Sequence, residues 1–272
     1  MLLFTSDLDR TLIYSQRMMD LYPPNTMPVI AERKNGEALS MMTEVTMSLL
    51  QQVQQQTLFV PVTTRAVHQY ERIHAIKELR PAFAITSNGG TIIEQGRPNE
   101  EWSKILRKRI EDSAIPQADL VRRFDRIKSE QWLQQSFYVD ELFYVHYVDC
   151  NVLQNDEVQA MIQDFAAYGW HVLLQGRKLY FLPKVLTKEA AISYLKEHCT
   201  YNMHVAAGDS IMDYGMLASA DRGYTPKHGD LKDKQPQILK NSIYSAYSGE
   251  AFTKYLLEDV LQLAAEQPIV EV

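Results

Sequence analysis

Short apolar runs recur near both ends of the chain, and each one stops at a group of small polar residues. The runs are long enough for buried strands and too short for helices, and they cover residues 2–4, 57–62, 81–86 and 203–207. Apolar side chains at helical spacing predict helices over residues 43–55, 70–79, 186–195, 214–220 and 250–265. Residues 218–224 lead into one more short strand, predicted at an edge. Strands that alternate with helices predict an α/β domain with a Rossmann-like parallel sheet.

The polar residues that end these strands form a second pattern. Parallel strands end at one edge of their sheet, and ligands bind beyond that edge. The residues predicted there are Asp7, Asp9, Thr63 and Asn88, with a further acidic group at Asp209 and Asp213. Asp, Ser and Thr are also common in ordinary turns, but their recurrence after several strands favours a site. Asp7 and Asp9 repel each other at close range, and a hard divalent cation such as Mg²⁺ would relieve that repulsion.

Two other stretches depart from this alternation. Residues 14–35 are predicted to be irregular, because Pro23, Pro24 and Pro28 forbid a continuous helix. Residues 32–36 are predicted as an exposed turn at a hairpin tip.

The segment 91–183 has a different composition from the rest of the chain. It predicts helices over 102–115, 121–132 and 159–168, and strands over 137–148, 171–174 and 178–182. Helices combined with paired strands predict a separate α+β domain. We therefore predict a core formed by residues 1–90 and 184–272, with an inserted cap domain over 91–183. The basic residues of its first two helices are interpreted as solvated faces, with contact to an anionic substrate as the alternative.

Bulk properties exclude several classes of function. The chain has 272 residues, a net charge of −6 and a hydrophobic fraction of 46%, so attraction to nucleic acid or to an anionic membrane is not expected. Its apolar runs are too short to span a membrane. The first residues lack the basic segment of a secretory signal. Two cysteines, Cys150 and Cys199, lack metal-binding spacing and are predicted to be reduced thiols in a cytoplasmic protein.

The strand ends and the helix from residue 186 together supply groups for phosphoryl transfer. Thr187 is a predicted N-cap, and Lys188 lies in the first turn, where the helix dipole disfavours a cation. A lysine at that position often has an anion to contact. The set comprises Asp7, Asp9, Thr63, Lys188, Asp209 and Asp213. A carboxylate can attack phosphorus, Mg²⁺ and lysine can neutralise the phosphoryl group, and a second carboxylic acid can move protons.

These motifs resemble those of the haloacid dehalogenase-like (HAD) superfamily. Asp7-Leu-Asp-Arg-Thr11, Thr63, Lys188 and Gly208-Asp-Ser-Ile-Met-Asp213 follow one another as its four motifs do. The resemblance implies that Asp7 is the nucleophile and Asp9 the acid–base, and that Thr63 and Lys188 hold phosphoryl oxygens. It also implies that Mg²⁺ is held by Asp7, the backbone carbonyl of Asp9 and Asp209, with Asp213 close by. The insert resembles the type-two cap of the Cof-like and sucrose-phosphate-phosphatase-like branches, which selects the substrate.

Three residues depart from the pattern of these relatives. Thr64 replaces the glycine of the usual Thr-Gly-Arg, and Met212 stands where asparagine is frequent. Arg10 follows Asp9, where glycine, asparagine or histidine is more usual, so it could contact a substrate anion or point to solvent. The predicted substrate-binding residues are Asn88, Arg10 and Arg65.

The sequence thus predicts a Mg²⁺-dependent phosphatase of a small phosphomonoester, such as a sugar phosphate, acting through an aspartyl-phosphate. Asp9 argues against a dehalogenase, which needs no acid for its leaving group. The alternatives are a phosphomutase on the same scaffold and a phosphate-binding regulatory protein without turnover. The expected partner is a small-molecule phosphate, and both a monomer and a dimer are compatible with the sequence.

Overall fold

The computed structural model describes residues 1–234 and 239–267, so residues 235–238 and 268–272 of the predicted core lie outside the described part. The chain divides into two compact units, which we describe separately. The first unit contains residues 1–99 and 188–272, and the second contains residues 100–187. The boundaries of a functional core and cap, placed by sequence at residues 90 and 184, stay a prediction.

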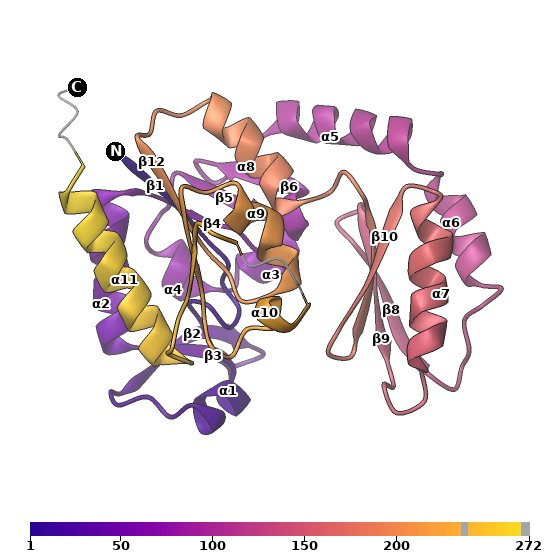
Figure 1. The fold of residues 1–272 in the computed structure, drawn as a ribbon, viewed down its shortest axis with the longest axis horizontal. Helices are drawn as coiled ribbons and strands as arrows, with labels where there is room; N and C mark the ends of the chain where they lie inside the picture. The colour runs from indigo at the N-terminus through magenta and orange to yellow at the C-terminus, as the bar shows by residue number, and fades with distance from the viewer. Residues whose placement is uncertain (235–238, 268–272) are drawn as a thin grey trace. The chain divides into compact units, whose positions relative to one another are not determined.

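A five-stranded parallel sheet organises the first unit, as the alternating pattern predicted (Figure 1). Its strands, in spatial order β14, β13, β12, β1 and β4, are Ser242–Tyr244, Arg222–Thr225, Met203–Ala207, Leu2–Ser6 and Leu58–Pro61. Strand β1 is buried along its whole length, which explains its unbroken apolar run. The prediction of β13 as an edge strand is wrong, because the three-residue strand β14 pairs with its outer side.

The strand predicted over 81–86 extends this sheet by a single bridge. It is β5 (Phe83–Thr86), which pairs antiparallel with β6 (Thr91–Glu94), itself paired with β7 (Arg97–Pro98). A parallel bridge joins Val62 to Ile85, and the Thr63 amide donates to the Ile85 carbonyl at 2.8 Å. The end of β5 therefore lies beside the end of β4.

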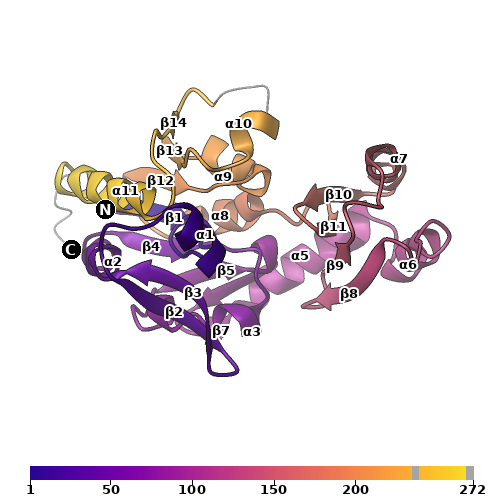
Figure 2. The ribbon, with the colours of Figure 1, turned by 90° about the horizontal axis from the view of Figure 1, so that it is seen from below.

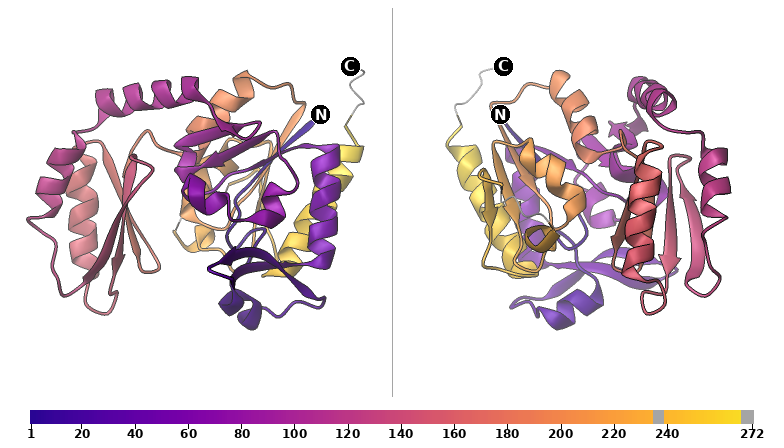
Figure 3. Two further views of the ribbon diagram at one scale, coloured as in Figure 1. Left: turned by 180° about the vertical axis from the view of Figure 1, so that it is seen from behind. Right: turned by 45° about the vertical axis from the view of Figure 1, so that its right-hand side comes forward.

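Helices cover both faces of the central sheet. Helices α2 (Glu44–Gln56) and α11 (Glu250–Ala265) pack side by side on one face (Figure 3). Helices α8 (Lys188–Glu197) and α9 (Tyr214–Ala218) pack together on the other. The helix predicted over 70–79 is instead two short helices, α3 (Val67–Tyr70) and α4 (His74–Lys77).

A buried carboxylate links α2 to α11. Glu250 accepts hydrogen bonds from the backbone amide of Thr43 at 2.7 Å and from the hydroxyl of Thr46 at 3.0 Å. Thr43 is also the N-cap of α2. Burial raises the pKa of Glu250 to about 7, although the bonds from Thr46 and Thr43 oppose that shift.

We expect Glu250→Gln to flatten the dependence of stability on pH. Because the folded-state pKa is raised, the native state binds more protons than the unfolded state, and stability falls as pH rises towards 7. Glutamine keeps the acceptor and carries no charge, so the variant should gain about 3 kcal/mol over the parent between about pH 5 and pH 8. Urea unfolding at several pH values measures this difference. Parallel stability curves for the two proteins would contradict it.

Residues 14–43 are more regular than the sequence indicated. They form helix α1 (Gln16–Leu21) and a hairpin of β2 (Pro28–Lys34) and β3 (Glu37–Thr43) (Figure 2). Asn35 and Gly36 form its turn with φ angles of 52° and 85°, so the predicted tip is correct at these two residues. Glu32, predicted in the exposed turn, is completely buried.

The second unit is an antiparallel sheet with helices α6 (Gln117–Phe124) and α7 (Asn155–Ala166) on one face (Figure 1). Helix α5 (Glu100–Ser113) precedes them, and the sheet order is β10, β11, β9, β8. Strands β10 (Trp170–Gln175) and β11 (Lys178–Pro183) form the predicted hairpin. Phe124, Phe165 and Phe181 contribute to the core between sheet and helices.

Two predictions for this unit are wrong. The single strand predicted over 137–148 is a hairpin of β8 (Leu133–Val139) and β9 (Phe143–Val148). Its turn contains Asp140 and Glu141, both with positive φ. The helix predicted over 121–132 ends at Phe124. Within residues 1–234 and 239–267, no helix is long and apolar enough to cross a membrane.

Candidate active site

Asp7 and Lys188 form the buried centre of the site at the carboxyl edge of the sheet. The Asp7 amide donates to the carbonyl of Ala207 at 2.9 Å, which anchors the end of β1 to the end of β12. The Lys188 Nζ atom lies 2.7 Å from Asp7 Oδ1 and 2.6 Å from Asp213 Oδ1. Lys188 is the first residue of α8, so these two carboxylates supply the anions that its unfavourable position in the helix dipole requires.

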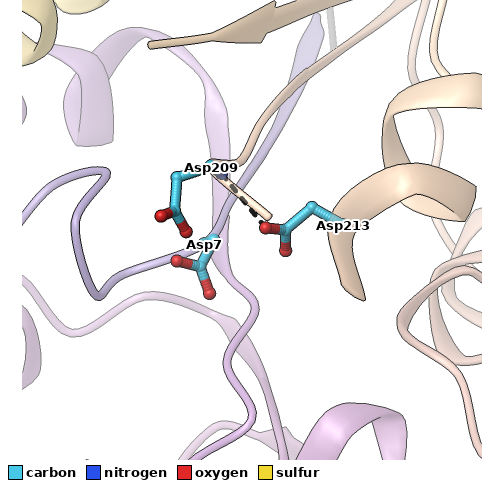
Figure 4. A group of neighbouring side chains, drawn as sticks. All are labelled: Asp7, Asp209 and Asp213. Atoms are coloured by element: carbon cyan, nitrogen blue, oxygen red, sulfur yellow. Dashed lines mark hydrogen bonds between the residues drawn. The ribbon is translucent and has the colours of Figure 1, made fainter. Parts of the chain in front are cut away.

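Three carboxylates share this small volume (Figure 4). Oxygens of Asp7, Asp209 and Asp213 all lie within 4.8 Å of one another. Burial raises the pKa of Asp7 to about 7, with Lys188 lowering it and Asp213 raising it further. Burial and the charge of Asp7 also raise the pKa of Asp209 well above its ordinary range. The cluster therefore favours additional positive charge, either protons or a cation.

The lysine is held in its charged form by the same contacts. Burial alone would lower the pKa of Lys188, but the charges of Asp213 and then Asp7 raise it above its ordinary value. Its side chain is 1% exposed, so both carboxylates meet a fixed cation with little screening by water.

Asp213 organises the loop that carries Asp209. Its Oδ2 atom accepts hydrogen bonds from the Asp209 amide at 3.1 Å, the Ser210 amide at 2.9 Å and the Ser210 hydroxyl at 3.0 Å. A Cβ atom on Gly208 would lie 2.4 Å from the Asp213 Cβ, so this packing requires glycine. With Lys188 on its other oxygen, Asp213 has donors on both sides.

Asp209 presents a different environment. Its Oδ2 atom is buried and accepts no hydrogen bond from any residue that the structure describes. The Nε atom of Arg10 lies 3.1 Å away in an ion pair, but its N–H does not point at this oxygen. A buried carboxylate oxygen without a hydrogen-bond donor suits a hard cation. Asp7 and Asp209 therefore fit the donor set that Mg²⁺ prefers.

Arg10, predicted to face a substrate or solvent, lies against this acidic cluster. Its φ of 63° is left-handed, a conformation that residues other than glycine, asparagine and aspartate adopt rarely. Its Nη2 atom donates to the carbonyl of His228 at 2.8 Å, and His228 Nε2 donates back to the Arg10 carbonyl at 2.8 Å. The Gly249 amide donates to His228 Nδ1 at 3.1 Å, which sets this tautomer. The Arg10 side chain is 40% exposed, so a ligand can still reach it.

Asp9 is two residues from Asp7, but its carboxylate is bound by Arg65 and not by Lys188. Arg65 donates from Nε to Asp9 Oδ2 and from Nη2 to Asp9 Oδ1, both at 2.7 Å. The remaining Nη1 atom donates to Glu32 Oε2 at 2.5 Å. Burial alone would lower the pKa of Arg65, but its bonds and charge contacts with Asp9 and then Glu32 raise it above its ordinary value. Arg65, predicted to bind substrate, is thus a partner of Asp9.

Thr63 and Asn88 come from neighbouring loops that hydrogen bonds join. The Asn88 amide donates to the Thr63 carbonyl at 3.0 Å, and the Ser87 amide donates to the Arg65 carbonyl at 2.7 Å. The Thr63 hydroxyl accepts from the Arg65 amide at 3.1 Å and keeps its own hydrogen to donate. Asn88 has a φ of 58°, a conformation that asparagine tolerates well. The structure therefore brings Thr63 and Asn88 to the edge where Asp7 lies.

Sequence reasoning missed Glu32 and His228. Glu32 follows Val29-Ile30-Ala31, and a carboxylate next to an apolar run was the only local sign that it is buried. His228 lies in a polar loop between Thr225 and Asp233, where nothing in the sequence indicates contact with Arg10.

A sequence model of the family described as sucrose-6F-phosphate phosphohydrolase matches residues 1–241. Among curated proteins, none matches the chain.

Solved structures resemble this fold over nearly the whole chain. The sucrose-phosphatase of Synechocystis sp. PCC6803, solved in complex with sucrose and phosphate, has a TM-score of 0.68 at 16% identity, over 96% of this chain and 97% of that one. A haloacid dehalogenase-like hydrolase from Bacteroides thetaiotaomicron has a TM-score of 0.56 at 16% identity, over 96% and 98%. The trehalose-6-phosphate phosphatase of Aspergillus fumigatus has a TM-score of 0.50 at 12% identity, over 96% and 92%.

These structural likenesses establish the HAD-like fold, and the match to the family model covers most of the sequence. The chain therefore belongs to the sucrose-6F-phosphate phosphohydrolase family, and it is a HAD-like hydrolase of phosphoric monoesters.

Proposed function

We propose that this protein is a Mg²⁺-dependent phosphatase that hydrolyses a small sugar phosphate through an aspartyl-phosphate on Asp7. The observation that carries the proposal is the contact of buried Asp7 with Lys188, beside the buried oxygen of Asp209. A nucleophilic carboxylate needs positive charge nearby, because the phosphoryl group it attacks is itself anionic.

The proposed reaction has two halves. In the first, an Asp7 oxygen forms a bond to phosphorus, the bond from phosphorus to the sugar oxygen breaks, and the Asp9 carboxyl gives that oxygen a proton. In the second, water attacks the aspartyl-phosphate and gives a proton to Asp9, which releases phosphate and restores Asp7. Lys188 offsets phosphoryl charge throughout, and the Thr63 hydroxyl donates to a phosphoryl oxygen.

A divalent cation fits beside these groups. Asp7, Asp209 and the backbone carbonyl of Asp9 would hold Mg²⁺, which when bound neutralises charge on the phosphoryl oxygens. We assign Asp213 the role of holding Lys188 and the 209–210 loop, because both of its oxygens already accept hydrogen bonds.

A sugar phosphate is the favoured substrate class for two reasons. The family is named for hydrolysis of a sucrose phosphate, and the Synechocystis sucrose-phosphatase was solved with sucrose and phosphate. We propose that the unit of residues 100–187 acts as the cap that selects the sugar, and that Arg10 and Asn88 contribute contacts from the core.

A phosphate-release assay tests this function. The purified protein is given sucrose 6F-phosphate, trehalose 6-phosphate, glucose 6-phosphate and p-nitrophenyl phosphate, with Mg²⁺ or with EDTA. We expect phosphate release from at least one sugar phosphate, and a loss of about 100-fold or more in EDTA, because the carboxylate cluster lacks a neutralising cation there. Restored activity after Mg²⁺ is added back excludes irreversible damage by the chelator.

Two outcomes would contradict hydrolysis and support the alternatives. Conversion of a sugar phosphate to its positional isomer without free phosphate would indicate a phosphomutase. Tight binding of a sugar phosphate with no turnover across the panel would indicate a regulatory protein.

A further inference from the structure

We propose that Glu32 is a positioning residue for Asp9, and that it acts by holding Arg65 in the orientation that aims its guanidinium at the Asp9 carboxylate. The inference rests on the proposed role of Asp9 as proton donor and acceptor. It adds a residue from the β2–β3 hairpin to a site otherwise formed by the loops after the sheet strands and by the start of α8.

An irregularity in the hairpin turns Glu32 inward. Ile30 pairs with Met41 and Glu32 pairs with Ser40, so Ala31 is an extra residue in β2. Such a bulge changes which side of the strand the next side chain occupies, and bulges are frequent next to active sites. As a result Glu32 is completely buried, although the hairpin turn three residues later is exposed.

Both Glu32 oxygens are bound by cations. Oε2 accepts from Arg65 Nη1 at 2.5 Å and from the Ser40 hydroxyl at 3.4 Å, and Oε1 accepts from Arg72 Nε at 3.2 Å. Buried ion pairs of this kind contribute little net stability compared with apolar residues of similar size. A role in orientation explains their presence better than a role in stability.

The rigid guanidinium transmits this orientation to Asp9. Arg65 uses Nη1 for Glu32, and Nε with Nη2 for the two oxygens of Asp9. Because these nitrogens lie in one plane, fixing Nη1 also fixes the edge that faces Asp9. The Arg65 side chain is 14% exposed, whereas that of Asp9 is 47% exposed. The buried Glu32 is therefore the anchor, and the carboxylate at the open site is the group that it positions.

This arrangement is compatible with proton transfer by Asp9. The two hydrogen bonds from Arg65 occupy one lone pair on each oxygen of Asp9. A carboxylate has about four lone pairs that can accept hydrogen bonds, so a carboxyl held in this way can still receive and donate a proton. The charges alternate along the chain of contacts from Arg72 through Glu32 and Arg65 to Asp9. Without Glu32, the Arg65 charge would lose its buried partner, and the side chain would be able to turn away from Asp9.

The test compares substrates whose leaving groups differ in their need for a proton. Values of kcat/KM are measured for glycerol 2-phosphate, phenyl phosphate and p-nitrophenyl phosphate, since kcat/KM reports steps up to formation of the aspartyl-phosphate. For Glu32→Gln we expect a loss of about 10- to 100-fold on glycerol 2-phosphate, whose alkoxide must be protonated, and less than about 3-fold on p-nitrophenyl phosphate. Glu32→Asp should recover part of the loss, because it retains the charge.

Matched controls separate positioning from general destabilisation. Glu250→Gln changes another buried carboxylate of the same unit, one that contacts none of these groups, and it should leave all three kcat/KM values unchanged. If Glu32→Gln does not fold, Arg65→Lys replaces it, because lysine keeps the charge without the planar fork. It should show the same dependence on the leaving group.

The outcomes distinguish this inference from the proposed function. An equal loss of kcat/KM on all three substrates, or no loss, would overturn the positioning role while hydrolysis by the parent protein stands. Faster hydrolysis by Glu32→Gln would also overturn it, since the ion pair would then restrain Asp9 rather than position it. If the parent protein hydrolyses no phosphomonoester, the proposed function and this inference fail together.

Discussion

Asp7→Asn is expected to abolish phosphomonoester hydrolysis, with a loss of about 10⁴-fold or more in kcat. An amide cannot form the aspartyl-phosphate, and no other described carboxylate contacts Lys188 except that of Asp213, whose second oxygen is bound to the 209–210 loop. The variant should fold, because the asparagine oxygen can still accept from Lys188. Phosphate release from the best substrate of the panel measures the loss of activity, and thermal unfolding shows whether the variant is folded.

A matched control and a chemical probe sharpen the result. Glu250→Gln should keep full activity, since it alters a buried carboxylate away from the site. In the parent protein, single turnover in ¹⁸O-labelled water should place label in the released phosphate and none in Asp7, because water attacks phosphorus and the Asp7 carboxylate leaves with its own oxygen. Mg²⁺-dependent hydrolysis that survives unchanged in Asp7→Asn would remove Asp7 from the role of nucleophile.

Lys188→Met is expected to lower both activity and stability. Methionine has a similar length but leaves the buried carboxylates of Asp7 and Asp213 without their cation. Removing one partner of a buried ion pair typically costs about 3–5 kcal/mol, and we expect a loss of this size in the free energy of unfolding in EDTA. Urea unfolding measures it, and kcat should fall by about 100-fold or more, because the phosphoryl charge is no longer offset.

Two further measurements identify the cause of this loss. In Lys188→Met the Asp7 carboxyl, whose pKa burial already raises to about 7, loses the cation that lowers that pKa and should take up a proton, so the loss should be smaller at about pH 5 than at about pH 8. The sign follows from the raised pKa of Asp7, because a group with a raised folded-state pKa loses its stabilising contribution as pH rises through that value. A second change, Asp213→Asn, should recover part of the stability in a double-mutant cycle. A loss that is independent of pH and additive with Asp213→Asn would mean that packing, not charge, is responsible.

The strands and the acidic centre could be predicted because their signals are local in the sequence. A strand that is buried along its whole length and opens with an apolar run, such as Leu2–Ser6, can be recognised without knowledge of its neighbours. The polar groups that end it follow at once, and topology alone then assigns Asp7 and Asp209 to one edge. Lys188 was predicted from its unfavourable position at a helix start, and the structure pairs it with two aspartates.

The remaining features depend on contacts between distant residues. Glu32 is buried only because Arg65 and Arg72 reach it from another part of the chain, and an isolated glutamate near a turn is normally exposed. The β8–β9 turn was missed because Asp140 and Glu141 adopt left-handed angles without glycine, so the sequence lacks the usual hairpin signal. Strand β14 has only three residues and is recognised by its pairing with β13.

The position of β1 between β12 and β4 has a consequence for how the chain folds during its synthesis. Strand β1 (Leu2–Ser6) pairs with β12, and Leu2 lies opposite Met203. Asp7 contacts Lys188, which lies 181 residues later in the sequence. During synthesis the first strand leaves the ribosome long before its second neighbour exists. The acidic centre therefore cannot form until residues 100–187 have been translated. The pairing of β1 with β12 across so long a separation in sequence is also intrinsically slow. Catalytic competence should accordingly be among the last properties that a nascent chain acquires.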